Sequence, residues 1–389
     1  MTPLEAFGAW TGDDRVFWRA PGQRAVVGLG AARTVEVAGP WRFDDAAAAA
    51  AEMLDEGEIA FGGFAFFDQR AAGAWAGYPS GRLVVPERLV RGPVPEAGGA
   101  DGSLGGGADG GADGGLGGRG LQVHDETRST YRDAVKKAVE AIDDGELAKV
   151  VVARVVEAVG RVDPAVVLAR LAGRFRSCAV FGIGRGTTCF VGASPEVLVE
   201  QDGDVVTTYA VAGTAPRGAD PAEDAAHAER LVSDPKEQAE HRYVVDYLRT
   251  RLALAGVELD PTGEPELRTL PGIHHLNTTI TGRISPAPGG ALRLVGALHP
   301  TPAVGGTPST FAQQWITEHE DLDRGWYAGP VGWIDHRGCG SFYVALRSAL
   351  VGPAGLRLIA GAGVVAGSDP EQELIETDIK LDAVLDVVT

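Results

Sequence analysis

The sequence predicts an α+β protein with large antiparallel β-sheets. Several apolar, strand-like runs follow one another as hairpins, and one of them turns at Asp202 and Gly203, a pair that favours tight turns. Long helical patterns lie among these hairpins and do not alternate regularly with single strands. This arrangement favours antiparallel sheets that carry helices, and it argues against a doubly wound parallel sheet.

The N-terminal part of the chain, residues 1–97, is expected to be rich in strands. The strand-like runs lie at 24–30, 58–67 and 81–90. Residues 98–120 follow as a low-complexity, glycine-rich segment that has little to bury, so we expect a flexible loop there. Because no linker divides two independent cores, residues 1–389 are expected to form a single domain, with its functional motifs in 121–389.

The part after this loop mixes long helices with further hairpins. Helical spacing at Tyr131, Val135 and Ile142 predicts a helix that stops at Gly145. The glycines of FGIGRGTT predict a hairpin and not a nucleotide fingerprint. The remaining expected elements are strands at 149–158, 178–184, 188–213 and 355–365, helices at 233–252 and 309–319, and a hairpin from 327–335 to 341–351.

The C-terminal segment GSDPEQELIETDIKLDAVL predicts a helix that begins near Pro370. Ser368 and Asp369 can each cap it, and Glu371 is expected to complete a capping box with Ser368. A stripe of apolar residues should pack on the core: Leu374, Leu381, Val384, Leu385 and Val388. Beside that stripe, Glu373, Glu376 and Lys380 share one face, which either meets water or holds a cation.

Composition limits the classes of partner. The chain has 389 residues, is 44% hydrophobic and carries a formal net charge of -18. Such a chain can bury a large core, but it lacks the basic footprint of a nucleic-acid-binding protein and would be repelled by anionic membranes. We therefore expect no nucleic acid and no membrane as partners. An anionic substrate would need a few local cations or a divalent metal.

The N-terminus and the cysteines indicate the compartment. The first residues lack the basic start and long apolar run of a secretory signal, and no stretch has the length of a membrane span, so we expect a cytoplasmic protein. Cys178, Cys189 and Cys339 are scattered without metal-ligand or redox spacing, and we expect ordinary core thiols.

Two residues have the chemistry of a general base and a general acid. Lys149 opens an aliphatic strand, where desolvation favours the neutral amine that a base needs; the alternative is a surface lysine at a strand edge. Glu196 follows a Ser-Pro turn beside apolar strands, where a carboxyl group can stay protonated; the alternative is an ordinary turn glutamate.

Three carboxylates on two helices have the chemistry of a Mg²⁺ site. Glu240 lies near the start of one helix, and Glu373 and Glu376 lie near the start of the other. Acidic residues at helix starts are also stabilised by the helix dipole without any function, so this alternative stays open. Arg347 interrupts an apolar strand and needs an anion, for which a substrate carboxylate is one candidate.

Nine segments between residues 121 and 387 form an ordered set of motifs. They read KVVVAR, FVGASPE, AVAGTAPRG, DPKEQAEH, HHLNTTITG, LHPTPAVGGTP, RGWYAGPVGW, ALRSA and AGAGVVAGSDPEQELIETDIK. Together they resemble the chorismate-utilising enzymes, a family of isochorismate, salicylate, anthranilate and aminodeoxychorismate synthases. The resemblance implies a four-layer α/β/β/α fold, in which two large antiparallel sheets stack and helices cover their outer faces. It also implies a Mg²⁺-dependent reaction on chorismate and a monomeric chain.

The same resemblance implies roles for individual residues. Glu240 and Glu376 are implied as Mg²⁺ ligands, with Glu373 binding directly or through water. Arg347 and Tyr327 are implied as partners of the enolpyruvyl carboxylate. Further implied substrate contacts are Gly213, Thr214, His275, Ala303, Gly361 and Lys380.

Three positions favour one branch of this family. Members that add water resemble this chain in having Lys149 as the base, whereas anthranilate synthases have Gln there. Ala212 stands where aminodeoxychorismate synthases carry a nucleophilic lysine, and Ser309 stands where salicylate and aminating relatives typically have Lys. We therefore expect an isochorismate synthase with Glu196 as the acid. A salicylate synthase is the alternative, and the pathway served, menaquinone or siderophore, stays open together with its downstream isochorismate-using enzyme.

Overall fold

The computed structural model of the chain describes residues 1–68, 72–94, 121–270 and 273–388. These residues form an α+β fold with two large antiparallel sheets, as the sequence predicts. The glycine-rich loop expected at 98–120 lies outside the described residues.

The first sheet joins strands from all parts of the chain. Its strand order is β16-β8-β20-β19-β10-β9-β1-β2-β6, and β7 pairs with β8. The strands are β1 (Asp14–Arg19), β2 (Ala25–Leu29), β6 (Arg88–Gly92), β7 (Gln122–His124), β8 (Lys149–Val159), β9 (Ala179–Arg185), β10 (Thr188–Ser194), β16 (Gly306–Thr307), β19 (Ser348–Gly352) and β20 (Gly355–Val364).

The second sheet has the order β13-β15-β12-β11-β18-β17-β4-β5-β3, and β14 pairs with β15. Its strands are β3 (Arg33–Val37), β4 (Ile59–Phe64), β5 (Gly81–Val85), β11 (Val197–Asp202), β12 (Val205–Pro216), β13 (Glu258–Leu259), β14 (Glu266–Leu270), β15 (Ile273–Arg283), β17 (Pro330–Asp335) and β18 (Gly340–Val344).

N-terminal strands pair directly with strands of the later motifs. In the first sheet β1 pairs with β9, with Trp18 opposite Phe181. In the second sheet β4 pairs with β17, with Phe61 opposite Trp333. Residues before the glycine-rich segment therefore supply the neighbours of strands that carry the motifs, whereas the assignment of one domain to the whole chain stays a prediction.

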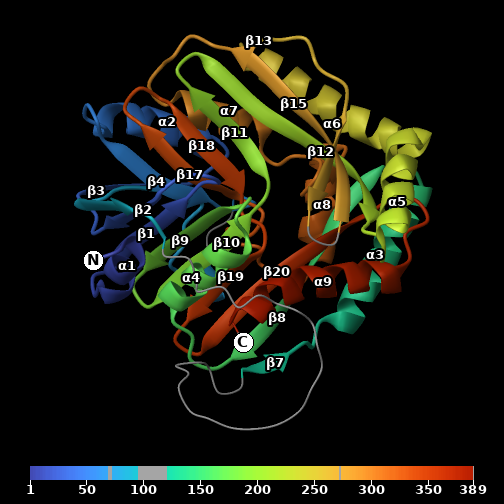
Figure 1. The fold of residues 1–389 in the computed structure, drawn as a ribbon, viewed down its shortest axis with the longest axis horizontal. Coiled ribbons are helices and arrows are strands. Elements are labelled where there is room, and N and C mark those ends of the chain that lie inside the picture. The colour runs from blue at the N-terminus through green and yellow to red at the C-terminus, as the bar shows by residue number, and fades with distance from the viewer. Residues whose placement is uncertain (69–71, 95–120, 271–272, 389) are drawn as a thin grey trace.

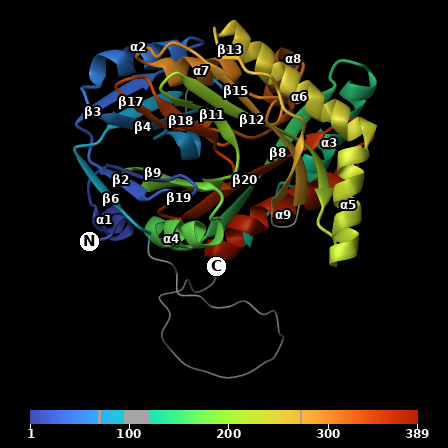
Figure 2. The ribbon, with the colours of Figure 1, turned by 45° about the horizontal axis from the view of Figure 1, so that its top comes forward.

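Helices cover the outer faces of both sheets, and the layers are seen in Figures 1 and 2. Helices α1, α3, α4 and α9 pack on the first sheet, and α2, α5, α6 and α7 pack on the second. The helices are α1 (Pro3–Ala9), α2 (Arg42–Met53), α3 (Arg128–Asp143), α4 (Pro164–Arg174), α5 (Pro221–Ser233), α6 (Pro235–Leu254), α7 (Gly290–Leu298), α8 (Ser309–His319) and α9 (Pro370–Val388), with a short 3-10 helix at Gly73–Trp75. None of the helices in the described ranges is long and apolar enough to cross a membrane.

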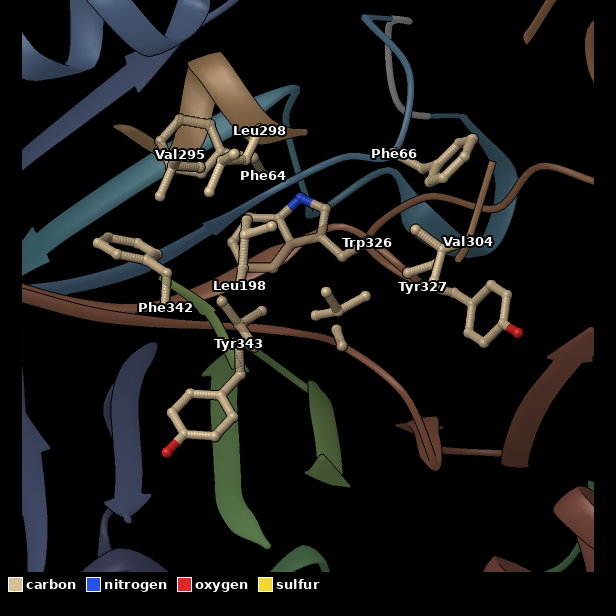
Figure 3. Close-up of a cluster of buried hydrophobic side chains, with 14 of the residues drawn as sticks. Phe64, Phe66, Leu198, Val295, Leu298, Val304, Trp326, Tyr327, Phe342 and Tyr343 are labelled. Carbon is tan, nitrogen blue, oxygen red and sulfur yellow. The ribbon is translucent and has the colours of Figure 1, made fainter. Parts of the chain in front are cut away.

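The main hydrophobic core includes side chains from both sheets. Trp18 of the first sheet meets Tyr343 of the second edge to face, with 5.8 Å between the ring centres. Figure 3 shows Trp326 at the centre of one part of this core, and Tyr327 at its border with the hydroxyl pointing away from the other labelled side chains. The hydroxyl of Tyr327 therefore lies at the edge of the apolar core and points out of it.

The terminal helix forms where the sequence predicts it, but one detail of its start is different. Asp369 caps α9 by accepting hydrogen bonds from the amides of Glu371 and Gln372, both at 3.0 Å. The expected capping box between Ser368 and Glu371 is wrong. Ser368 Oγ instead donates to Glu373 Oε1 at 2.7 Å, and Glu371 forms an ion pair with Arg132.

Candidate active site

Lys149 and Glu240 meet at the start of β8. Lys149 Nζ donates to Glu240 Oε1 at 2.9 Å, and the two side chains are 20% and 31% exposed, so the pair is partly shielded from water. Gly363 of the neighbouring strand β20 leaves room for the lysine, because a Cβ at that position would lie 2.9 Å from Lys149 Cε. The predicted base and a predicted metal ligand are therefore in direct contact.

Glu196 lies in the connection between β10 and β11. Its backbone amide donates to Ser194 Oγ at 3.1 Å, and the preceding carbonyl of Pro195 accepts a hydrogen bond from Arg268 Nη2 at 3.1 Å. Burial raises the pKa of Glu196 to about 7, although the positive charges of Lys149, Lys380 and Arg268 oppose this rise. A substantial fraction of this carboxyl group is thus protonated at neutral pH.

The polar face of α9 lies against β20. Lys380 Nζ donates to Glu376 Oε1 at 2.7 Å and to the carbonyl of Gly361 at 2.8 Å. Burial raises the pKa of Glu373, and the nearby charge of Glu376 raises it further, while the hydrogen bond from Ser368 opposes both effects. Lys380 therefore ties this face to the sheet that carries Lys149, while the side chains of Lys380 and Glu376 remain 41% and 46% exposed.

Tyr327 and Gly361 also adjoin each other. The phenol of Tyr327 contacts the backbone of Gly361, and a Cβ at Gly361 would come within 3.3 Å of its hydroxyl. Burial raises the pKa of Tyr327 to about 12, so the hydroxyl keeps its proton and can donate a hydrogen bond. Lys380 and Tyr327 thus converge on one segment of β20.

Arg347 and His275 lie within electrostatic range of each other. Arg347 follows β18 with a backbone φ of 46°, a left-handed conformation that is strained for a non-glycine residue. His275 Nδ1 lies 3.3 Å from the carbonyl of Gly213. Burial lowers the pKa of His275 to about 4 despite that contact, and the charges of Lys380, Arg347 and Arg268 lower it further. His275 is thus a neutral group among cations.

Ala303 and Thr214 are two further predicted substrate contacts. Ala303 lines a small cavity together with Glu196, so the structure brings this pair together. Thr214 lies in β12, but its side chain is outside the described part of the structure. The neighbouring Gly213 has a φ of 75°, which a residue with a side chain adopts only with strain, and its carbonyl is directed toward His275.

Each of the three predicted Mg²⁺ ligands has a hydrogen-bond partner in the structure. In the described ranges, no group of three or more His, Cys, Asp or Glu side chains is already placed to hold a metal ion. Glu240, Glu376 and Glu373 use Oε1 for Lys149, Lys380 and Ser368, respectively. Their donor chemistry fits Mg²⁺, and carboxylates that now hold ammonium groups can exchange those cations for a metal. The assignment of these ligands stays a prediction.

Arg268 is the main site residue that the sequence did not reveal. It lies on the short strand β14, where nothing in ELRTLPG distinguishes it from a surface arginine. Its contact with Pro195 and its electrostatic effect on Glu196 and His275 appear only when β14 folds beside β15. Arg268, Arg347, Lys149 and Lys380 give an acidic chain a local set of cations, which suits an anionic ligand.

Comparison with known proteins identifies the class to which this fold and site belong. The family model described as chorismate binding enzyme matches residues 120–389. This match covers more than half of the chain, and the chain belongs to that family.

Individual relatives are consistent with this membership. A protein of Pseudomonas aeruginosa named salicylate biosynthesis isochorismate synthase is 42% identical over 265 residues, which are 68% of this chain and 56% of that protein. The chain thus matches little more than half the length of this relative. Isochorismate synthase DhbC of Bacillus subtilis is 37% identical over 264 residues, 66% of each chain.

A solved structure agrees over almost the whole fold. The crystal structure of a candidate 2,3-dihydroxybenzoate-specific isochorismate synthase, DhbC from Bacillus anthracis, aligns with a TM-score of 0.79 and 29% identity. The alignment covers 99% of this chain and 98% of that one. The arrangement of both sheets is thus shared with that protein, including the strands before residue 120.

Proposed function

We propose that this chain is an isochorismate synthase, which converts chorismate to isochorismate in a Mg²⁺-dependent reaction. The observation that carries this proposal is the state of Glu196. Its pKa of about 7 keeps an acid available at neutral pH, within electrostatic reach of the amine of Lys149. Water addition with loss of a hydroxyl group needs such an acid and such a base in one site. The names of the relatives support the same substrate and product.

The proposed reaction exchanges one hydroxyl position for another. Lys149, as a neutral amine, takes a proton from a water molecule whose oxygen bonds to ring carbon 2. The ring double bonds shift, the carbon–oxygen bond at carbon 4 breaks, and Glu196 gives its proton to the departing hydroxyl, which leaves as water. One water enters and one leaves, so the product is an isomer of the substrate and the reaction is readily reversible.

The ion pair in the structure sets a condition for this step. An ammonium group has no lone pair to accept a proton, so Lys149, which pairs with Glu240 in the structure, has to lose a proton before it acts as the base. Glu240, Glu376 and Glu373 would hold the metal in the proposal. When bound, Mg²⁺ supplies positive charge that neutralises the ring carboxylate of the substrate.

The other residues bind and orient the substrate in the proposal. Arg347 and the protonated hydroxyl of Tyr327 hold the enolpyruvyl carboxylate, because a guanidinium and a phenol both donate to carboxylate oxygens. Lys380 and the backbone around Gly213 hold the ring carboxylate in the proposal. The neutral ring of His275 lines the site without adding charge. Together, these contacts fix the ring between the base and the acid.

Incubation of the protein with chorismate and Mg²⁺ tests the proposal. Isochorismate should appear by chromatography until it reaches equilibrium with chorismate, and a Lys149→Ala variant should make none. Absence of isochorismate with the folded wild-type protein would refute the proposal.

A salicylate synthase is the second candidate, because one relative has salicylate biosynthesis in its name. Such an enzyme would remove pyruvate from isochorismate in the same site. Salicylate fluorescence distinguishes the two: stoichiometric salicylate without an added lyase would replace our proposal with this one. The cytoplasmic location, the monomeric state and a downstream isochorismate-using enzyme, in a menaquinone or a siderophore pathway, remain predictions.

A further inference from the structure

Strands β11 and β12 are hydrogen-bonded along only part of their length. Their register joins Glu200 to Thr207, and ends at the turn with Asp202 opposite Val205. Beyond Glu200, toward Glu196, the described structure has no further backbone pair of the two strands, and the link there is a side-chain one, in which Thr208 Oγ1 donates to the carbonyl of Leu198 at 2.7 Å. On its other edge, β11 also has an irregularity in its register with β18, between Val197 and Val199. The backbone ladders on both edges of β11 are therefore irregular next to the predicted acid.

A small cavity lies at this irregularity. Its lining comes from both strands, from α6 and from the loop after Pro300, and it includes Glu196, Leu198, Thr208, Val244, Thr301 and Ala303. Its volume is about 10 Å³, which is close to what one water molecule needs.

Thr301 lines this cavity and has a side-chain oxygen without a hydrogen-bond partner in the described structure. The residue is only 6% exposed, and its Oγ1 has no hydrogen-bond partner among the described residues. The carbonyl of Thr301 accepts hydrogen bonds from the amides of Val304 at 3.2 Å and Gly305 at 3.0 Å, which hold the loop in place. Because a buried hydroxyl without a partner costs free energy, a water molecule in contact with it would be stabilising.

We propose that one ordered water molecule occupies this cavity, bound to Thr301 Oγ1, and that it hydrogen-bonds to Glu196. Thr301 is then a positioning residue, which acts on the acid through the water. The cavity and the unpartnered hydroxyl alone support the presence of the water. The part of this water in catalysis rests on the proposed function.

The charged groups around Glu196 set the direction of the effect. Lys149 from β8, Lys380 from α9 and Arg268 from β14 act on the carboxyl group from different elements and favour its ionised form. The phenol of Tyr327 lies within electrostatic range as well. A water that donates a hydrogen bond to the carboxylate acts in the same direction as the cations. Loss of that water should therefore raise the pKa of Glu196.

The test compares two variants at Thr301. Thr301→Val keeps the shape of the side chain and removes the hydroxyl, and Thr301→Ser keeps the hydroxyl as the matched control. Infrared difference spectra recorded across a pH series follow the protonated carboxyl band, which is assigned to Glu196 by its loss in Glu196→Gln. We expect the pH midpoint of the Glu196 titration to rise by roughly half a pH unit to one pH unit in Thr301→Val and to stay unchanged in Thr301→Ser.

A high-resolution crystal structure of the wild-type protein gives a second measurement that needs no variant to fold. Electron density for a water within hydrogen-bonding distance of Thr301 Oγ1 is expected, and a dry cavity would overturn the proposal. An unchanged midpoint in folded Thr301→Val would overturn the link to Glu196. Neither measurement uses chorismate, so a protein that shows the water and the shift but no isochorismate formation refutes the proposed function and not this inference.

Discussion

The raised pKa of Glu196 should make the stability of the folded protein depend on pH, and this can be measured without substrate. A carboxyl group whose pKa is raised on folding stabilises the folded protein while it is protonated, and that stability is lost as the pH rises from the unfolded value through the folded one. For Glu196 these values are 4.5 and about 7. As the pH rises from 5 to 8, ionisation of this group should therefore lower the free energy of unfolding by up to about 2.5 kcal/mol.

Glu196→Gln removes this titration. Between pH 5 and pH 8 the free energy of unfolding of the variant should therefore fall by up to about 2.5 kcal/mol less than that of the wild type. Urea denaturation at both pH values measures the difference. Glu229→Gln, which changes an exposed carboxylate on α5, serves as the matched control and should follow the wild type. Parallel pH dependences for the wild type and Glu196→Gln would show that the carboxyl group is ionised at neutral pH, and the proposed acid would lose its physical basis.

Three further predictions concern the base, the metal and the core. Lys149→Ala should abolish isochorismate formation while calorimetry shows chorismate binding largely retained; retained turnover would indicate another base. Glu376→Gln should weaken Mg²⁺ binding about tenfold or more, since a charged ligand is lost, and an unchanged calorimetric Mg²⁺ titration would remove it from the metal site. Arg324→Met should cost about 3–5 kcal/mol in urea denaturation, because it leaves Glu320 charged in the core, where both side chains are at most 2% exposed. The exposed Arg283→Met should cost less than about 1 kcal/mol, and equal effects would contradict this reasoning.

Local chemistry explains the parts of the fold that the sequence predicts well. Helices α6 and α9 begin with Asp-Pro, and in each the Asp side chain accepts hydrogen bonds from amides of the first turn. Helices α4 and α5 begin in the same way, at Asp163 and Asp220, and could have been predicted from the same signal. Such starts need only neighbouring residues, so they can be recognised without knowledge of the fold.

Contacts between distant segments could not be predicted in this way. Arg268 is 73 residues away from Pro195 in sequence, and only the pairing of β14 with β15 brings it to the turn before Glu196. Ser368 shows that even contacts between neighbouring residues cannot always be predicted from the sequence, because its hydroxyl had several possible hydrogen-bond partners. The folded structure satisfies it with Glu373 and the amide of Val365, which leaves no capping box with Glu371.

The buried Arg154 shows why the face of α9 could not be interpreted from its own residues. This arginine lies in β8, the strand that starts with Lys149, and its guanidinium donates to Thr377 Oγ1 and Asp125 Oδ1, both at 2.7 Å, and pairs with Asp378. Arg154 is 2% exposed, so removing its partners would leave a buried charge unpaired. Because Thr377 directly follows Glu376, this network fixes the rotation of α9 about its axis relative to β8. Glu373 consequently lies within electrostatic range of Lys149, the proposed base, whereas the side chain of Glu376 remains 46% exposed, and the spacing along the helix alone could not establish this difference.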